Sequence, residues 1–311
     1  MKTGIKVFAP ATVSNLGCGF DLLGFAINGP GDVIKAKFCD TPGIRITKIT
    51  KGKMLPREAH KNTAGVSAMA VLEFLGKEKE IGIELEIHKK MPFGSGMGSS
   101  AASAVGAAVA VNELLDRPLT KWQLLPMVSK GEQIASGGAI HLDNVAPSLL
   151  GGLIFNRNNA EFDVHRVYTP KGIYCSLVYP HIKILTKDAR DILSPTTTLK
   201  QHVEQSANLG GLLLGFINGD LDLVARSLKD VIVEPQRAKL ITGFYDVQKA
   251  AMEAGAMGCS ISGAGPSIFA LSSNSLIAEE VGKAMGEVYE RLGIQHNLYV
   301  STINNEGALL F

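Results

Sequence analysis

A glycine-rich segment between a predicted strand and a predicted helix is the part of the sequence that best indicates chemistry. Residues 91–102 read MPFGSGMGSSAA. They follow an alternating apolar strand pattern at 83–88 and precede an alanine-rich run that predicts a helix from Ser99 to about Leu115. Glycine lets the backbone turn tightly and lets a ligand approach it. A helix start adds unpaired N–H groups and the positive end of the helix dipole. The segment therefore predicts an anion site, and phosphate is the anion that it suits best.

Other interpretations of this loop are weaker. It is not a Walker A loop, because no lysine precedes Ser99 and Ser100. It is not a dinucleotide fingerprint either, because the glycines lack the G-x-G-x-x-G spacing and no acidic residue follows at the expected distance. A turn that only caps the helix is the remaining alternative. The serine pair at the helix start favours the phosphate site over that alternative.

The segment resembles the second motif of the GHMP kinases, a family that includes galactokinase and mevalonate kinase. The family pattern is Pro-x-x-x-Gly-Leu-Gly-Ser-Ser-Ala, and the chain matches it at Pro92, Gly96, Gly98 and residues 99–101. Met97 departs from the usual leucine, which exchanges one apolar side chain for another. The departure leaves the resemblance intact.

Three further segments carry the same resemblance over nearly the whole chain. Residues 9–25, APATVSNLGCGFDLLGF, resemble the first motif in the form found in members that phosphorylate homoserine. Residues 258–268, GCSISGAGPSI, resemble the third motif, and residues 141–152, HLDNVAPSLLGG, narrow the choice within the family. The resemblance implies ATP-dependent phosphorylation of the side-chain hydroxyl of L-homoserine. The product would be O-phospho-L-homoserine, on the route to threonine.

The predicted elements favour an α+β fold, because strands and helices mix without strict βαβ alternation. Strands are predicted at 5–8, 33–38, 44–47, 83–88, 173–178, 258–262, 267–271 and 298–303, and helices at 64–75, 99–115, 121–135, 199–217, 220–229, 243–255 and 276–292. The resemblance implies the two-domain GHMP kinase fold, with an N-terminal ribosomal-S5-like ATP-binding domain over 1–165. The resemblance also implies a C-terminal ferredoxin-like domain over 166–311. The active site would lie in the cleft between the two domains. Polar stretches at 156–159 and 169–172 indicate a candidate linker.

Charge, apolar runs and cysteine content exclude several classes of function. A net charge of +2 is too small to argue for nucleic acid or an anionic membrane as partner. The longest apolar run, 101–111, is too short to span a bilayer. The four cysteines show neither CxxC spacing nor a disulfide-like framework, and residues 1–3 show no secretory signal. We therefore expect a cytoplasmic enzyme. The resemblance further implies that the protein forms a homodimer.

The resemblance assigns ATP and its metal to the N-terminal half. Asn62 and Thr63 match a family position near the adenine pocket, although by themselves they are an ordinary helix start. Ser99 and Glu132 match positions associated with Mg²⁺, and a hydroxyl with one carboxylate and waters suits this octahedral cation. Without the resemblance, Glu132 would be an ordinary helix carboxylate. The loop residues expected to bind ATP are Pro92, Gly94, Ser95, Gly96, Met97, Gly98, Ser99, Ser100, Ala101 and Ala102.

The substrate needs a complementary group for each of its charges. Arginine binds a carboxylate through two parallel hydrogen bonds, and Arg190 and Arg237 match the family's substrate-binding arginines. Asp21 fits the ammonium group. Both arginines could equally be surface ion-pair residues if the resemblance were set aside. Further residues that match substrate-binding positions are Asn15, His141, Thr186 and Gly263.

The transfer step requires positioning and positive charge more than covalent chemistry. We expect Asn144 to orient the substrate hydroxyl and Arg190 to stabilise the charge on the γ-phosphoryl group, with Asp143 in the same pocket. Some relatives use an aspartate near the position of Asp143 or Asn144 as a base, whereas members that act on homoserine are thought to manage without one. A loose transition state needs little deprotonation before attack.

Two other functions stay open at this point. A GHMP kinase acting on mevalonate or a sugar is disfavoured by the combination of Asp21 with two arginines. A nucleotide-binding regulator on an inactive kinase fold is disfavoured because Ser99, Glu132 and the glycine loop are intact. Turnover of ATP, as opposed to binding alone, would discriminate between an enzyme and a regulator.

Overall fold

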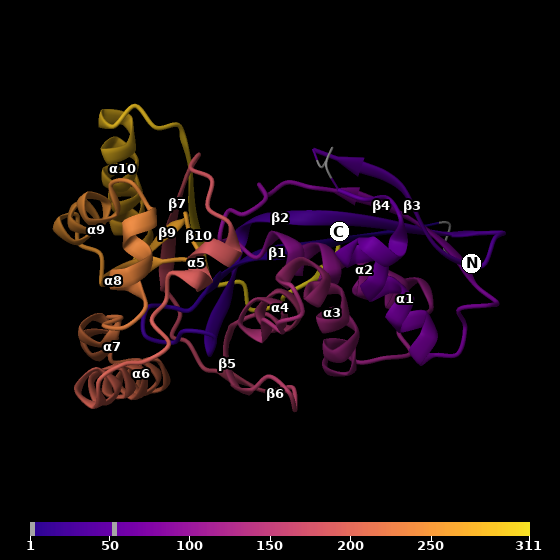
Figure 1. The fold of residues 1–311 in the computed structure, drawn as a ribbon, viewed down its shortest axis with the longest axis horizontal. Coiled ribbons are helices and arrows are strands. Elements are labelled where there is room, and N and C mark those ends of the chain that lie inside the picture. Colours follow the sequence, from indigo (N-terminus) through magenta and orange to yellow (C-terminus); the bar gives the residue numbers. More distant parts are fainter. Residues whose placement is uncertain (1–3, 52–54) are drawn as a thin grey trace.

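The computed structural model describes residues 4–51 and 55–311, which form two sheets with helices packed against them (Figure 1). The strands are β1 (Ile5–Ser14), β2 (Leu23–Cys39), β3 (Gly43–Thr50), β4 (Gly82–His88), β5 (Leu153–Asn158), β6 (Asp163–Val167), β7 (Tyr174–Pro180), β8 (Gly258–Ile261), β9 (Ile268–Ser272), β10 (His296–Thr302) and β11 (Leu309–Leu310). The helices are α1 (Thr63–Phe74), α2 (Ser99–Leu114), α3 (Lys121–Ser136), α4 (Leu142–Leu150), α5 (Thr186–Asp191), α6 (Leu199–Asn218), α7 (Leu221–Ser227), α8 (Glu234–Arg237), α9 (Phe244–Glu253) and α10 (Ser275–Arg291), with short 3-10 helices at Ala59–Lys61 and Ala238–Leu240.

The first sheet carries the N-terminal half. Its strands run in the order β11-β1-β2-β4-β3, and β5 pairs with both β2 and β6. β3 and β4 are parallel neighbours, whereas β1, β2 and β4 are antiparallel. Helices α1 to α4 lie on one face of this sheet (Figure 1), with α2 and α4 packed against β1 and β2. The first residues of α2 and α4 are thereby held at the same end of the layer.

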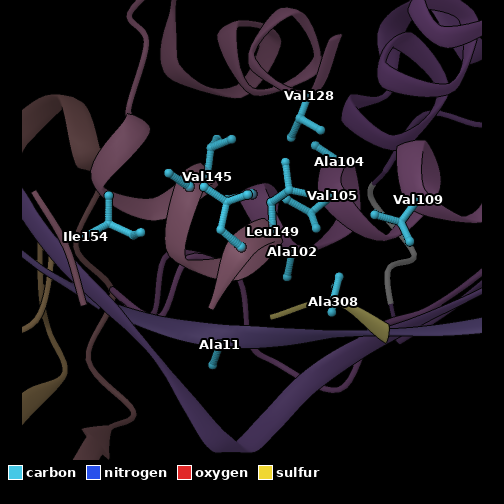
Figure 2. Packing of buried hydrophobic residues seen from close by; sticks show 14 of the residues in the cluster. Ala11, Ala102, Ala104, Val105, Val109, Val128, Val145, Leu149, Ile154 and Ala308 are labelled. Carbon is cyan, nitrogen blue, oxygen red and sulfur yellow. The ribbon is translucent and has the colours of Figure 1, made fainter. Parts of the chain in front are cut away.

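Helix α2 lies at the centre of the first core because its own residues are small on every side, so other elements can pack closely around it. Every residue from 101 to 112 is buried, and Figure 2 shows Ala102 and Val105 among residues of α4 and the sheet. At Gly106 an added Cβ would lie 2.6 Å from Ile34 Cγ1, so only glycine allows this approach to the sheet. This packing fixes where α2 begins, immediately after the glycine-rich loop.

The second sheet carries most of the C-terminal half. Its order is β10-β7-β9-β8, with every neighbouring pair antiparallel. Helices α9 and α10 pack on it around a separate core that contains Val178, Phe244, Ile268, Val281 and Tyr289. Helices α6 and α7 pack against each other at the outer edge of this half (Figure 1).

The predicted α+β fold is confirmed, and the differences concern the bounds of some strands and several short elements, including α4 (Leu142–Leu150), that were not predicted. The strand predicted at 33–38 is the end of the 17-residue β2. The linker predicted at 156–159 is wrong for Asn156–Asn158, which end β5 and pair with β6. Asn156 is buried there, and its Nδ2 donates to the backbone carbonyl of Asp21 (3.1 Å). Helices α5 and α8 were not predicted, because elements of one or two turns carry no apolar period.

The predicted domain boundary after residue 165 stays a prediction. It falls inside β6, a strand of the first sheet, and β11 near the C-terminus pairs with β1 of the same sheet. In the described part of the chain, no helix has the length and apolar character needed to cross a membrane. Residues 1–3, considered above for a secretory signal, lie outside the described residues.

Candidate active site

A cavity of about 250 Å³ lies where the four motif segments meet. It opens between the first sheet's helices and the segments of the C-terminal half that carry α5 and the turn after β8. Its lining residues are Ser14, Asn15, Asp21, Phe93, Gly94, Ser95, Gly96, Gly98, Ser99, Ser100, Glu132, Ala135, His141, Asp143, Asn144, Thr186, Arg190, Arg237, Gly263, Ala264 and Gly265. Most of the residues predicted from the sequence are therefore brought together.

The glycine-rich loop needs glycine because other backbone segments approach it closely. An added Cβ at Gly96 would lie 2.4 Å from the carbonyl oxygen of Ser262, and one at Gly98 would lie 2.1 Å from Thr12 Oγ1. Both residues have positive φ, and Gly98 is the N-cap of α2. No side chain in the described residues caps this helix start. Its first N–H groups therefore suit an anion at the cavity wall.

Three polar side-chain atoms of the cavity lining are buried and lack a hydrogen-bond partner among the described residues. They are Ser95 Oγ, Ser99 Oγ and His141 Nε2. Leaving a buried polar atom unsatisfied costs about 1–3 kcal/mol, so native proteins rarely keep several in one place. A polar ligand in this cavity would satisfy them.

Glu132 of α3 fits a cation beside Ser99. Ser100 Oγ donates to Glu132 Oε1 (2.8 Å), and burial, with Asp143 nearby, raises the pKa of Glu132 to about 7. A bound cation would lower that pKa again. Among the described residues no group of three or more His, Cys, Asp or Glu side chains could hold a metal ion. A divalent cation here would therefore combine Ser99 and Glu132 with phosphate oxygens and water, as Mg²⁺ does.

A buried ion pair beneath the loop was missed by the sequence reasoning. The ammonium of Lys89 contacts the carboxylate of Asp32 and donates to the carbonyl of Ser99 (2.7 Å) and to Ser103 Oγ (2.8 Å). Asp32 also accepts from the backbone N–H of Lys90 (2.9 Å). The pair thus ties the residues before the loop to the first turn of α2. No sequence pattern indicates this pair, because Lys89 and Lys90 are two adjacent lysines of which only Lys89 is buried.

On the opposite side of the cavity, Asp21 and Arg190 form an ion pair between distant parts of the chain. Arg190 Nη2 lies 3.0 and 3.1 Å from the two carboxylate oxygens of Asp21. The side chains are 34% and 44% exposed, so this pair contributes little to stability and can exchange partners. Asp21, Asn15 and Leu16 all have positive φ. Such backbone strain in non-glycine residues concentrates at functional sites.

Arg237 is a second cation beside Arg190, but it is buried and fixed. Its Nε donates to the carbonyl of Ala189 (2.8 Å) and its Nη1 donates to the carbonyl of Gly263 (3.0 Å). Burial, and to a lesser degree Arg190, lowers the pKa of Arg237 to about 10, which still leaves it charged at neutral pH. Both guanidinium groups lie over the ring of Phe20, at 4.9 Å for Arg237 and 5.4 Å for Arg190. Phe20 was not among the predicted site residues.

Asn144 is oriented by hydrogen bonds on both sides of its amide. Its Nδ2 donates to Ser14 Oγ (3.0 Å), and its Oδ1 accepts from Thr12 Oγ1 (2.7 Å). The neighbouring Asp143 is buried, and burial raises its pKa to about 7 while a hydrogen bond from Ser14 opposes the shift. Burial also lowers the pKa of His141. Ser14 thus interacts with both Asn144 and Asp143, although the sequence reasoning did not single it out.

A few predicted residues do not line the cavity. Asn62 caps α1, with its Oδ1 accepting from the N–H of Ala64 (3.0 Å) and its Nδ2 donating to the carbonyl of Pro56 (2.8 Å), and Thr63 begins that helix. The others outside the lining are Pro92, Met97, Ala101 and Ala102. The last three are fully buried core residues. Lining residues that the sequence reasoning missed are Ser14, Phe93 and Ala135.

Family models match both halves of the chain. The model for the N-terminal domain of GHMP kinases matches residues 64–152, and the model for the C-terminal domain matches residues 212–291. The first match contains the loop, α2, α3 and α4. The second contains the turn after β8.

Full-length relatives and solved structures agree with the family models. The homoserine kinase of Chlorobium phaeobacteroides strain BS1 is 45% identical over 99% of both chains, and that of Chloroherpeton thalassium is 44% identical over 97% of both. The crystal structure of homoserine kinase from Cytophaga hutchinsonii is 48% identical and superposes with a TM-score of 0.97, covering 100% of this chain and 98% of that one. Mevalonate kinase of L. major, at 16% identity and a TM-score of 0.74 over 97% and 98% of the two chains, shares the fold alone.

The buried ion pair generates a stability prediction. Lys89→Met leaves the carboxylate of Asp32 buried without its cation, so we expect the free energy of unfolding to fall by about 3–5 kcal/mol. Lys90→Met, at the exposed neighbouring position, is the matched control and should stay within about 0.5 kcal/mol of the unsubstituted chain. Denaturant titration measures both. Equal stabilities for the two variants would contradict the assigned role of Lys89.

The raised pKa of Glu132 predicts a pH dependence. The folded protein keeps this proton up to about pH 7, whereas the unfolded chain loses it near the ordinary value of 4.5. The ligand-free protein should therefore lose up to about 3 kcal/mol of stability from this group as pH rises through that window. Glu132→Gln should remove this part of the loss of stability with rising pH. The similar pH-dependent loss that comes from Asp143 should remain. Identical pH profiles for variant and unsubstituted chain, in urea unfolding at several pH values, would contradict the assignment.

Proposed function

The chain belongs to the GHMP kinase family and has homoserine kinase activity, and we propose that the cavity described above is where ATP and L-homoserine react. The reaction transfers the γ-phosphoryl group of ATP to the side-chain hydroxyl, giving O-phospho-L-homoserine and ADP, a step of threonine biosynthesis. One observation supports this placement above the others. A phosphate-type loop shares a single cavity with one accessible carboxylate and two arginines.

The phosphates of ATP are proposed to bind the loop and the start of α2. The uncapped N–H groups after Gly98 and the unpartnered Ser95 Oγ support this role. Ser99 and Glu132 are proposed to hold Mg²⁺, which when bound would neutralise charge on the phosphates and the transferring group. The adenine site at Asn62 and Thr63 remains a prediction. The side chain of Asn62 already caps α1, so a contact with adenine would come from the backbone around it.

The amino-acid part of the substrate is proposed to exchange with the Asp21–Arg190 ion pair. Asp21 would bind the ammonium group, and Arg190 and Arg237 would supply charge for the carboxylate. Because homoserine brings one charge of each sign, the exchange keeps every charge paired. Arg190 can leave Asp21 more easily than Arg237 can leave its two carbonyl partners. Arg190 is therefore also the arginine proposed to stabilise the γ-phosphoryl charge.

The remaining polar residues are proposed to position the substrate. Asn144, fixed by Thr12 and Ser14, would orient the hydroxyl toward the phosphoryl group. Asp143 would receive the hydroxyl proton once the new bond has formed, since burial holds its pKa near 7. A loose transition state does not require earlier removal of that proton. Asn15, His141, Thr186 and Gly263 would complete the homoserine pocket.

Several broader properties are proposed on the resemblance alone. The chain is proposed to act in the cytoplasm and to form a homodimer. The N-terminal domain is proposed to span 1–165 and the C-terminal domain 166–311.

Substrate analogues test the ion-pair exchange. γ-Hydroxybutyrate lacks the ammonium group of homoserine but keeps its hydroxyl and carboxylate. Asp21→Asn should lower kcat/KM for homoserine by at least about tenfold, because a charge-assisted hydrogen bond is lost. The same substitution should change kcat/KM for γ-hydroxybutyrate much less. An equal loss with both substrates, in an assay of ADP release, would contradict the assignment of Asp21 to the ammonium group.

The assigned role of Asn144 predicts a different kinetic pattern. Asn144→Ala should lower kcat by about 10²-fold or more while raising KM for homoserine much less, because misdirecting the hydroxyl affects the transition state more than binding. Ser148→Ala, in the same helix but bonded to the carbonyl of Pro10, is the control. An unchanged kcat for Asn144→Ala in steady-state assays would rule out the role.

A further inference from the structure

Phe20, in the turn between β1 and β2, has a ring against which two cations of the cavity lie. The guanidinium carbon of Arg237 is 4.9 Å from the ring centroid, and that of Arg190 is 5.4 Å away. Among the described residues, no other ring has two cations against it. Phe20 is partly buried and does not line the cavity. Its ring therefore influences a bound ligand through its neighbours, not by direct contact.

The two arginines need an attraction that keeps them together, because like charges repel. Burial first and Arg190 second lower the pKa of Arg237 to about 10, so the two cations interact unfavourably. Arg237 is fixed by its bonds to the carbonyls of Ala189 and Gly263. In the described part of the chain, the side chain of Arg190 hydrogen-bonds to Asp21 alone. Arg190 is therefore the cation whose position depends on weaker contacts.

Substrate binding, as proposed above, withdraws Asp21 from Arg190. The ammonium group of homoserine would take the carboxylate, and Arg190 would lose its ion-pair partner. The contact between Arg190 and the ring of Phe20 does not involve Asp21, so the exchange leaves it in place. A cation is attracted to the face of an aromatic ring by the quadrupole of that ring. The ring would therefore keep Arg190 beside Arg237 while the substrate carboxylate arrives.

An aromatic ring suits this position better than a carboxylate would. A ring attracts a guanidinium group without using its N–H groups, which stay free for a bidentate bond to a carboxylate. It also adds no negative charge that would repel the substrate carboxylate. The backbone of the turn fixes the ring, because Asp21, the next residue, donates its N–H to Asn15 Oδ1 (3.1 Å) and accepts at its carbonyl from Asn156 Nδ2 (3.1 Å).

We propose, on the basis of the placement of homoserine proposed above, that Phe20 is a positioning residue whose ring holds Arg190 next to Arg237 as the pair that binds the substrate carboxylate. Recognition of the carboxylate then depends on a side chain that does not touch the substrate. Recognition of the ammonium group depends on the adjacent Asp21. A single turn of the first motif thus serves both charges of the zwitterion.

Two substitutions at position 20 separate the ring from its apolar bulk. Phe20→Leu keeps an apolar side chain but removes the ring face, so kcat/KM for homoserine should fall by at least about fivefold while KM for MgATP stays within about twofold. Phe20→Tyr keeps the ring face and is the matched control, which should stay within about twofold of the unsubstituted chain. Denaturant titration verifies that both variants are folded. An unchanged kcat/KM in Phe20→Leu, or an equal loss in Phe20→Tyr, would overturn the proposal.

Two analogues, used as inhibitors of O-phospho-L-homoserine formation, separate the carboxylate from the ammonium group without requiring turnover of the analogue. γ-Hydroxybutyrate keeps the carboxylate alone, and 3-amino-1-propanol keeps the ammonium group alone. Phe20→Leu should raise the inhibition constant of γ-hydroxybutyrate by at least about fivefold and leave that of 3-amino-1-propanol within about twofold. A general disturbance of the turn would reach Asp21 and weaken 3-amino-1-propanol as well. That result would overturn the proposal.

Arg190→Met separates the role of Phe20 from the proposed placement of homoserine. If homoserine binds as proposed, Arg190→Met raises KM for homoserine, because a charged partner of the carboxylate is lost. An unchanged KM in that variant would overturn the placement and the role of Phe20 with it. A raised KM in Arg190→Met together with unchanged kinetics in Phe20→Leu would overturn the role of Phe20 alone.

Discussion

The close approach of the turn after β8 to two other segments holds the whole site together. Ser262 Oγ donates to the carbonyl of Gly96 (2.6 Å), and the N–H of Gly263 donates to the carbonyl of Ser14 (3.1 Å). The carbonyl of Gly263 accepts from both Asn15 Nδ2 (2.8 Å) and Arg237 Nη1 (3.0 Å). One tight turn therefore fixes the phosphate-type loop, the first motif and an arginine relative to one another. Glycine at 96 is what permits this contact, because any side chain there would collide with the turn.

The two ion pairs of the site differ in burial, and this difference separates their roles. Lys89 and Asp32 are enclosed, and the ammonium has three acceptors around it, so that pair sets the geometry of the loop and the start of α2. Asp21 and Arg190 are partly exposed at the cavity, so water already competes for them and their mutual attraction is weak. A ligand with one positive and one negative group can replace that pair at little cost. In the proposed arrangement, the fixed charges would lie beneath the phosphates and the exchangeable charges beside the amino acid.

Most of the longer elements and many residues of the cavity lining could be predicted from the sequence, because motif residues and periodic apolar patterns are local signals. The alanine-rich run after Ser99 predicted α2, and the glycine spacing predicted the loop. Lys89, Asp32, Ser14 and Phe20 could not be found in this way, since their importance depends on contacts between residues far apart in the chain. The polar residues at the end of β5 were misjudged for the same reason, because Asn156 is buried and bonded to the backbone of Asp21, which is far away in the chain.

Together these features support the proposal that backbone N–H groups bind phosphate while side-chain charges recognise a zwitterionic alcohol. The most direct test of that description is the release of ADP from MgATP with L-homoserine, measured beside mevalonate and galactose. The account predicts rapid release with homoserine and only background release with the other two alcohols, neither of which carries an ammonium group for Asp21. Turnover with mevalonate or galactose at a rate comparable to that with homoserine, or no turnover with homoserine, would contradict it.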